Sequence, residues 1–318
     1  MRIEWDPLDV AVATLLDGVV RIHEGASVHE QSRDVLDMRW LADGPILTID
    51  RRGHVIWMRD RKIVDQRIRR PEFSPSDLFD ATLSAGGDRL IAIDRAPAPE
   101  MFQLFVVMLP SLESFRPKIF TDVPITSART RSLVCALAGN GATLALGFTT
   151  FPNPGRGFAL VDIATWKASD MGAANRIITR NTSDHPIDTD RRLRLELDYA
   201  GRRLAQALPE HEPAVGVVRV NAGAIYPREM TGGATAVAID RSGELVAYAY
   251  REVPTGTRGR LRFDYLDPKA EGGDRVDILD TQTLESELPD LVALAFSRDR
   301  RRLACLSSTG AIEIVPVP

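Results

Sequence analysis

Short apolar segments separated by polar turns recur along the whole chain. The clearest example lies near the C-terminus, where polar turns join the segments Leu291–Phe296, Leu303–Leu306 and Ile312–Val315. Apolar residues that alternate with a period of two between turn signals predict antiparallel strands, here a three-stranded meander. Such a sheet cannot cover both of its faces alone, so the pattern predicts several copies packed against one another.

Six looser copies of this unit precede it. In each copy an apolar strand, a turn containing Gly, Asp or Ser, and a second apolar strand follow one another, as in Leu36–Trp40 with Ile46–Ile49. Seven such units predict an all-β fold, a seven-bladed β-propeller of mostly four-stranded antiparallel blades formed as one domain by residues 1–318. The expected blades cover approximately residues 1–32, 33–70, 78–121, 131–172, 190–226, 233–288 and 290–318.

The outer strands of the blades are the least clearly marked. We expect them at Ala26–Gln31, Lys62–Ile68, Phe115–Phe120 and Ala168–Met171, and in the stretch that follows Val220. In the sixth unit we expect Val276–Leu279 as the third strand, which leaves room for only a short fourth strand.

The seventh unit is expected to have three strands. Its exposed edge is blunted by Pro316 and Pro318, because proline cannot donate a hydrogen bond to a neighbouring strand. Pairing of that edge with a strand from a partner is the alternative interpretation.

Two stretches resemble the repeats of the WD-repeat (WD40) family. Residues 17–22, Asp-Gly-Val-Val-Arg-Ile, are similar to the third strand of that repeat, and residues 294–299, Leu-Ala-Phe-Ser-Arg-Asp, are similar to its first-strand turn. The chain departs from the family pattern, since no unit ends in Trp-Asp and no Gly-His dipeptide opens a blade. The resemblance to a divergent WD40-like propeller implies a scaffold within a multi-protein assembly.

Alternate positions of the innermost strands are expected to face different environments. One column is wholly apolar and is predicted to pack between blades: Trp5, Trp40, Leu83, Leu137, Leu197, Ile239 and Phe296. The positions predicted to face the central channel are Glu4, Arg39, Thr82, Ala136, Glu196, Ala238 and Ala295, preceded by Arg2, Asp37, Asp80, Val134, Arg194, Ala236 and Ala293.

The channel positions favour structural ion pairs over a metal site. They contain no histidine, and their charges occur as neighbours of opposite sign: Glu4 with Arg39, Arg2 with Asp37, and Arg194 near Glu196. A metal-dependent propeller hydrolase would need several carboxylate, amide or imidazole ligands from different blades. We therefore expect no catalytic residue, no metal site and no cofactor.

Composition narrows the class of protein further. The net charge of −4 argues against a dedicated nucleic-acid binder. No apolar run approaches the roughly 18 residues of a membrane span, and the N-terminus lacks the layout of a secretory signal, so we expect a cytoplasmic protein. The richness in alanine, arginine and aspartate indicates a bacterial source. Cys135 and Cys305 lie in apolar runs and are expected to be reduced core thiols.

Long loops are expected on one face of the propeller. Loops between second and third strands and connections between blades open on the same face, and Thr149–Gly157 and Arg251–Arg275 are long examples. We predict that a protein partner binds there, because arginine mixed with aromatic residues is typical of interface anchors. The candidate residues are Arg258, Arg260, Arg262, Phe263, Tyr265, Phe151 and Arg156. Alternatively, residues 251–275 form a protruding two-stranded hairpin.

The leading hypothesis for function is a non-catalytic protein–protein interaction scaffold. It would be a subunit of a multi-protein complex, such as a bacterial signalling or defence complex, and would bind its partner through the long-loop face. One alternative is a lactonase-like propeller hydrolase, for which a bound metal or clustered carboxylates would be expected. The other is a small-ligand or peptide sensor that uses a deep polar pocket at the channel mouth.

Overall fold

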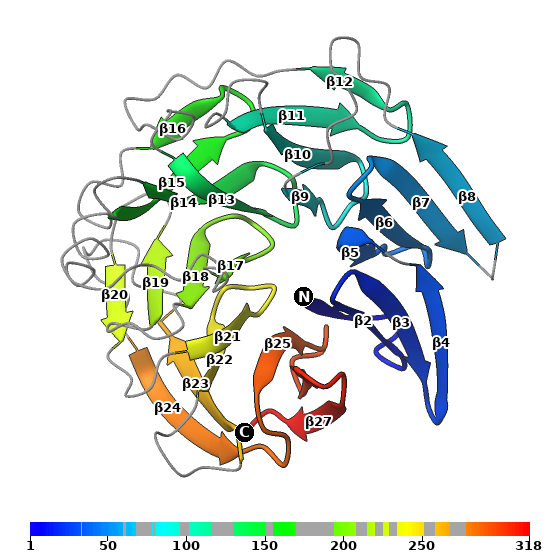
Figure 1. Ribbon diagram of the computed structural model, residues 1–318. Coiled ribbons are helices and arrows are strands. Elements are labelled where there is room, and N and C mark those ends of the chain that lie inside the picture. Colours follow the sequence, from blue (N-terminus) through cyan, green and yellow to red (C-terminus); the bar gives the residue numbers. More distant parts are fainter. Residues whose placement is uncertain are drawn as a thin grey trace.

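The structure is a computed structural model of the 318-residue chain. It describes residues 1–32, 34–59, 62–67, 78, 80–95, 102–115, 130–150, 155–169, 194–207, 215–219, 225–228, 234–250, 258–267 and 278–318. The described residues form seven antiparallel sheets that follow one another in chain order around a central axis (Figure 1). We number these sheets blades 1 to 7 from the N-terminus. The predicted seven-bladed propeller is thereby confirmed.

The first three blades have four strands each. Blade 1 contains β1 (Arg2–Trp5), β2 (Val12–Leu16), β3 (Val19–Glu24) and β4 (Ser27–Ser32). Blade 2 contains β5 (Val35–Trp40), β6 (Ile46–Asp50), β7 (His54–Arg59) and β8 (Lys62–Arg67). Blade 3 contains β9 (Asp80–Leu83), β10 (Arg89–Arg95), β11 (Phe102–Met108) and β12 (Glu113–Phe115).

The next three blades are also four-stranded. Blade 4 contains β13 (Thr130–Leu137), β14 (Thr143–Thr150), β15 (Gly155–Asp162) and β16 (Lys167–Ser169). Blade 5 contains β17 (Arg194–Leu197), β18 (Arg203–Ala207), β19 (Val215–Arg219) and β20 (Ile225–Arg228). Blade 6 contains β21 (Ala234–Ile239), β22 (Leu245–Tyr250), β23 (Arg260–Leu266) and β24 (Ile278–Glu285).

Blade 7 differs from the others within the described part of the chain. It has three strands, β25 (Leu291–Phe296), β26 (Arg302–Ser307) and β27 (Ile312–Pro316), as the short C-terminal unit predicted. The innermost strands of consecutive blades contact one another, and β25 contacts β1. These contacts close the ring.

The core lies between the blades rather than inside any one of them. All five residues of β2 are buried, because this strand packs between its neighbours on both faces of the sheet. Met38 of β5 is fully buried beside Leu15 and Ile46, which come from blades 1 and 2. The same arrangement joins blades 6 and 7, where Phe263 packs with Leu294.

Two strand predictions are wrong. In blade 6 the third strand is β23 rather than Val276–Leu279, and the fourth strand, β24, is eight residues long rather than short. The segment Arg251–Arg275 is therefore not one long loop, because β23 crosses its middle. In blade 3 the described outer strand is Glu113–Phe115, and residues 116–120 of the predicted strand Phe115–Phe120 lie outside the described residues.

Candidate functional site in the central channel

A cavity of about 320 Å³ occupies the central channel. Its walls come from the innermost strands, and its rim comes from the tight turns that join first to second strands. We call the face of the propeller that carries these turns the tight-turn face. Residues Ala42, Gly86, Gly139, Arg241 and Arg298 of five such turns line the cavity, which therefore opens on the tight-turn face.

Opposite charges meet inside the channel as the sequence predicted. Glu4 Oε1 lies 2.6 Å from Nη1 of Arg39 and 3.1 Å from Nη1 of Arg2. Asp37 Oδ1 lies 2.7 Å from Nε of Arg2. Two of the three predicted pairs are thus confirmed, and the third is not tested, because the side chain of Arg194 lies outside the described residues.

These ion pairs also join neighbouring blades. Asp37 accepts a hydrogen bond from the backbone N–H of Leu83 at 2.9 Å, and Nε of Arg39 donates to the Leu83 carbonyl at 3.1 Å. Burial alone would lower the pKa of Arg2, but the carboxylates of Asp37, Glu196 and Glu4 more than offset it, so the pKa is raised. Arg2 and Arg39 therefore act as fixed structural cations.

Glu196 is the channel carboxylate with a different environment. It lines the cavity from β17, and its side chain is partly buried. Burial raises its pKa, an effect that the positive charges of Arg2 and Arg39 only partly oppose. Among the described residues, no hydrogen bond or ion pair reaches its carboxylate. Its oxygens retain acceptor capacity toward the cavity.

The apolar column at the turn ends of the innermost strands has a mixed role. Trp5 is 5% exposed and packs between blades 1 and 7, and its indole N–H donates to the carbonyl of Ala295 at 3.0 Å. Trp40, Ile239 and Phe296 are only partly buried and line the cavity. All four side chains line the cavity, but the prediction that this column packs between blades holds best for Trp5, because the other three are less buried.

The rim of the cavity combines arginine with aromatic and apolar side chains. The guanidinium carbon of Arg241 lies 4.0 Å from the ring centroid of Tyr199, a cation–π stack. Arg298 is exposed on the same rim. Outside the cavity lining, Leu8 and Val10 of the blade 1 turn are 79% and 77% exposed. Exposed arginine and aromatic groups are enriched among residues that dominate binding energy at interfaces.

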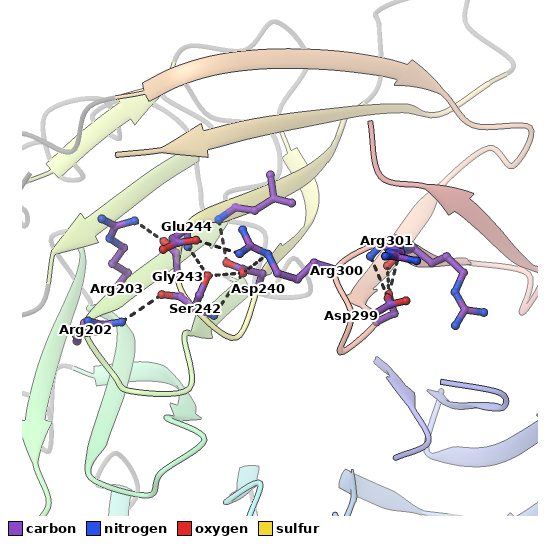
Figure 2. A network of polar contacts seen from close by, with 12 residues as sticks. Arg202, Arg203, Asp240, Ser242, Gly243, Glu244, Asp299, Arg300 and Arg301 are labelled. Carbon is purple, nitrogen blue, oxygen red and sulfur yellow. Dashed lines mark hydrogen bonds and ion pairs between the residues drawn. The ribbon is translucent and has the colours of Figure 1, made fainter. Parts of the chain in front are cut away.

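Arginines also hold adjacent turns together around the tight-turn face. Figure 2 shows Arg203 at the start of β18 reaching the next blade, where it donates to the carbonyl of Gly243. Arg203 also donates to the carbonyl of Asp267 at 2.7 Å. From the other side, Nε of Arg300 lies 2.9 Å from Oδ2 of Asp240, and its Nη1 lies 2.9 Å from Oε2 of Glu244. The blade 6 turn is thus held from both of its neighbours.

The same contact recurs in two other blades. Arg89 of blade 3 donates to the carbonyl of Gly141 at 3.1 Å, and Arg302 of blade 7 donates to that of Asp9 at 2.7 Å. Each accepting residue has a left-handed backbone, with φ of 69° at Gly141, 78° at Gly243 and 57° at Asp9. In each of these blades, the arginine that begins the second strand therefore binds the turn of the next blade.

The structure places most of the predicted partner-binding residues of blade 6 within the propeller. Phe263 is fully buried, so it offers no surface to a partner in this conformation. Arg262 lies 3.0 Å from the buried carboxylate of Asp264, and the Tyr265 hydroxyl donates to the carbonyl of Pro318. Strand alternation explains the placement, because residues 261, 263 and 265 face blade 7.

The remaining candidates lie at the opposite end of the strands from the tight turns. Arg258 and Arg260 lie 3.6 Å and 3.8 Å from the carboxylate of Glu285, and all three side chains are exposed to solvent. Arg156 lies in β15 opposite Thr149, but its side chain is outside the described residues. Phe151 and most of the long loops and blade connections also fall outside the described part of the chain.

Other chemistry in the described segments is limited. They contain no group of three or more His, Cys, Asp or Glu residues that could hold a metal ion. The thiols of Cys135 and Cys305 are free, and burial is the main cause that raises the pKa of each. No helix in these segments is long and apolar enough to cross a membrane.

Comparison with known proteins identifies the fold. No protein-family model and no curated protein sequence matches this chain. Among solved structures, a chain of Kuenenia stuttgartiensis hydrazine synthase is similar with a TM-score of 0.64 and 12% identity, over 99% of this chain and 95% of that chain. The Cps50 (Swd1) β-propeller domain of Myceliophteria thermophila is similar with a TM-score of 0.61 and 16% identity, over 100% of this chain and 97% of that chain.

A chain of the mitotic checkpoint complex is also similar, with a TM-score of 0.56 and 12% identity over 99% of this chain and 90% of that chain. The architecture is that of a divergent WD40-like β-propeller. At this level of identity the likeness concerns the fold alone, and the function must be argued from the side chains.

Proposed function

We propose that this propeller is a non-catalytic protein-interaction subunit of a multi-protein complex. The proposal draws support from similar propellers that occur in assemblies, such as the chain of the mitotic checkpoint complex. Hydrazine synthase is also similar, so the fold alone leaves an enzyme possible. In the channel, the described ion pairs join the innermost strands of neighbouring blades, which favours a structural use of those charges.

The observation that carries the proposed docking face is the exposure of two arginine side chains at the outer rim of blade 6. Arg258 and Arg260 share one carboxylate, that of Glu285, and all three groups face solvent. Both guanidinium groups are exposed to solvent at the end of the strands that lies opposite the tight turns. Exposed arginine provides donors in a planar fork that suits carboxylates of a docking protein.

Affinity capture from an extract of the source organism tests this docking face. We expect a stoichiometric protein partner with the wild-type chain and its loss with the Arg258→Ala/Arg260→Ala double variant. Exposed side-chain ion pairs contribute at most about 1 kcal/mol, so the thermal unfolding midpoint should change little. Mass spectrometry of the eluates identifies the partner and its stoichiometry.

A matched control is available on the same face. Arg51 and Arg52 are exposed in the turn between β6 and β7, and their replacement by alanine removes the same charge from another blade. The Arg51→Ala/Arg52→Ala variant should retain the partner. Equal retention by both double variants would argue against the blade 6 site, and turnover of a substrate by the purified chain would argue against the non-catalytic role.

A further inference from the structure

The central cavity contains a carboxylate that the internal ion pairs do not use. Four charged side chains line the cavity below its rim: Arg2 and Arg39 are positive, and Glu4 and Glu196 are negative. Arg2 and Arg39 lie within ion-pair distance of Glu4 or Asp37, whereas among the described residues no ion pair or hydrogen bond reaches the carboxylate of Glu196.

The position of Glu196 makes that carboxylate accessible from outside. Glu196 directly precedes Leu197, the last residue of β17, and so lies near the turn end of its strand. The cavity it lines opens on the tight-turn face, and its volume of about 320 Å³ is at the lower end of the roughly 300–1,000 Å³ found for ligand pockets. A single side chain or a small molecule can enter such a space.

The walls above Glu196 are suited to an alkyl chain with a cationic end. Trp40, Ile239 and Phe296 line the cavity and are only partly buried. Long basic side chains bury their methylene groups along apolar surfaces while the charged group stays paired, and cations are attracted to aromatic faces. Burial raises the pKa of Glu196, and the positive charges of Arg2 and Arg39 oppose this only in part.

The rim carries the opposite charge from the interior. Arg241 stacks on Tyr199 and is exposed, and Arg298 is exposed beside the same opening. A small free cation would be repelled by this rim. A basic side chain with acidic neighbours would instead match both charges. Its cation would lie near Glu196 inside the cavity, and its acidic neighbours would lie near the arginines of the rim.

We propose that the channel binds one basic side chain of an acidic peptide segment of a partner protein. Glu196 accepts hydrogen bonds from the guanidinium or ammonium group, Trp40 and Phe296 contact its methylene chain, and Arg241 and Arg298 bind the flanking carboxylates. This site lies at the opposite end of the strands from Arg258 and Arg260. The two sites can therefore be tested independently.

Fluorescence anisotropy with labelled peptides tests the site. The first probe is Ac-Glu-Asp-Arg-Asp-Glu-amide, and the second replaces arginine by citrulline, which has nearly the same shape without the charge. We expect the arginine peptide to bind at least about tenfold more tightly to the wild-type chain, because a charge-assisted hydrogen bond is lost with citrulline. With the Glu196→Gln variant, this preference should disappear.

Two controls separate the site from general electrostatics. Glu287→Gln removes the same charge at an exposed position outside the cavity and should preserve the preference for arginine. Arg241→Ala/Arg298→Ala should weaken both peptides and leave the arginine preference intact. The thermal unfolding midpoint of each variant shows whether it is folded.

Several outcomes would overturn the proposal. Equal affinity of the wild-type chain for the arginine and citrulline peptides would show that only the positive rim binds. An unchanged arginine preference in folded Glu196→Gln would remove Glu196 from the site. No binding of the arginine peptide at millimolar concentration would show that the channel does not accept such a segment.

Discussion

Charged residues of the channel differ in how their charge is compensated. Arg2 contacts two carboxylates within 3.1 Å, whereas no described group lies close enough to pair with Glu196. A buried carboxylate without a close cation favours its protonated form. Glu4 of blade 1 and Glu196 of blade 5 therefore differ: Glu4 takes part in ion pairs that join neighbouring blades, whereas burial raises the pKa of Glu196.

The pH dependence of stability should reveal this difference. The pKa of Glu196 in the folded protein is raised above its ordinary value of 4.5, so the folded state binds the proton at higher pH than the unfolded state does. Its contribution to stability is present below that ordinary value and is lost as the pH rises through the raised pKa. Glu196→Gln should therefore be more stable than the wild type at pH 7 and nearly equal to it in mild acid.

Urea unfolding followed by tryptophan fluorescence at the two pH values measures the difference. Glu287→Gln, at an exposed site, serves as the control for the change in total charge. A lower stability of Glu196→Gln at neutral pH would mean that the carboxylate takes part in a stabilising ion pair.

Sequence reasoning reached some of these residues and missed the distinction between them. Glu4 and Arg39 occupy equivalent positions on adjacent innermost strands, so their pairing followed from the alignment of the blades. Whether Glu196 has an ion-pair partner depends on the distances between side chains of different blades. The pattern of apolar and polar residues along one strand does not reveal those distances. The alternation of residues along the strands therefore predicted which side chains face the channel, but not which of them lacks an ion-pair partner.

At the scale of the elements, the blades were predictable because strand and turn signals repeat. Blade 6 was the exception. In β23, Arg260 and Arg262 alternate with the buried residues Leu261 and Phe263. The segment is therefore a strand with one buried face. The period of two was present, but the basic residues suggested a loop with interface anchors. Phe263 is buried because blade 7 packs against that face.

Some turns within a blade pack so closely against the neighbouring blade that they leave no room for an added methyl group. Gly201 has φ of +69°, and a Cβ there would lie 2.5 Å from Oγ1 and 2.7 Å from Cβ of Thr143 in blade 4. Gly25 has φ of +58° and open space around the Cβ position. Gly25→Ala should lower the free energy of unfolding by about 1–2 kcal/mol through the left-handed backbone alone. Gly201→Ala should cost an additional 1–3 kcal/mol or so from overpacking.

Chemical unfolding of the two variants under the same conditions separates these contributions. The comparison is informative because both glycines have left-handed backbones and only one faces a neighbouring blade. Equal losses would show that blades 4 and 5 adjust freely at this turn, contrary to the close packing expected between blades.

At the scale of the whole molecule, the ring closes through side chains rather than through a shared sheet. Within the described part of the chain, β1 pairs with β2 in blade 1, and blade 7 is built only from C-terminal strands. Both carboxylate oxygens of Asp9 lie 3.0 Å from the backbone nitrogen of Arg298 and accept its hydrogen bond. Arg302 donates to the Asp9 carbonyl and lies 4.8 Å from the ring centroid of Trp5. These contacts join the first and last blades.

Arg302 should consequently matter far more than its position near the surface suggests. Replacing it by alanine removes a charge-assisted hydrogen bond and a cation–π contact, which together contribute about 2–3 kcal/mol in comparable environments. The neighbouring Arg301 is exposed, and its side chain points away from the turn in Figure 2. Arg301→Ala should change the free energy of unfolding by no more than about 0.5 kcal/mol.

The two variants carry the same loss of charge, so their difference in stability isolates the closure contact. Because blades 1 and 7 come from opposite ends of the chain, their contact has the largest sequence separation in the ring. It cannot be replaced by local structure when it is weakened. Urea unfolding of both variants should show a cooperative transition at lower urea for Arg302→Ala, whereas equal midpoints would place the stability of the ring in the packing of Trp5 and its apolar neighbours.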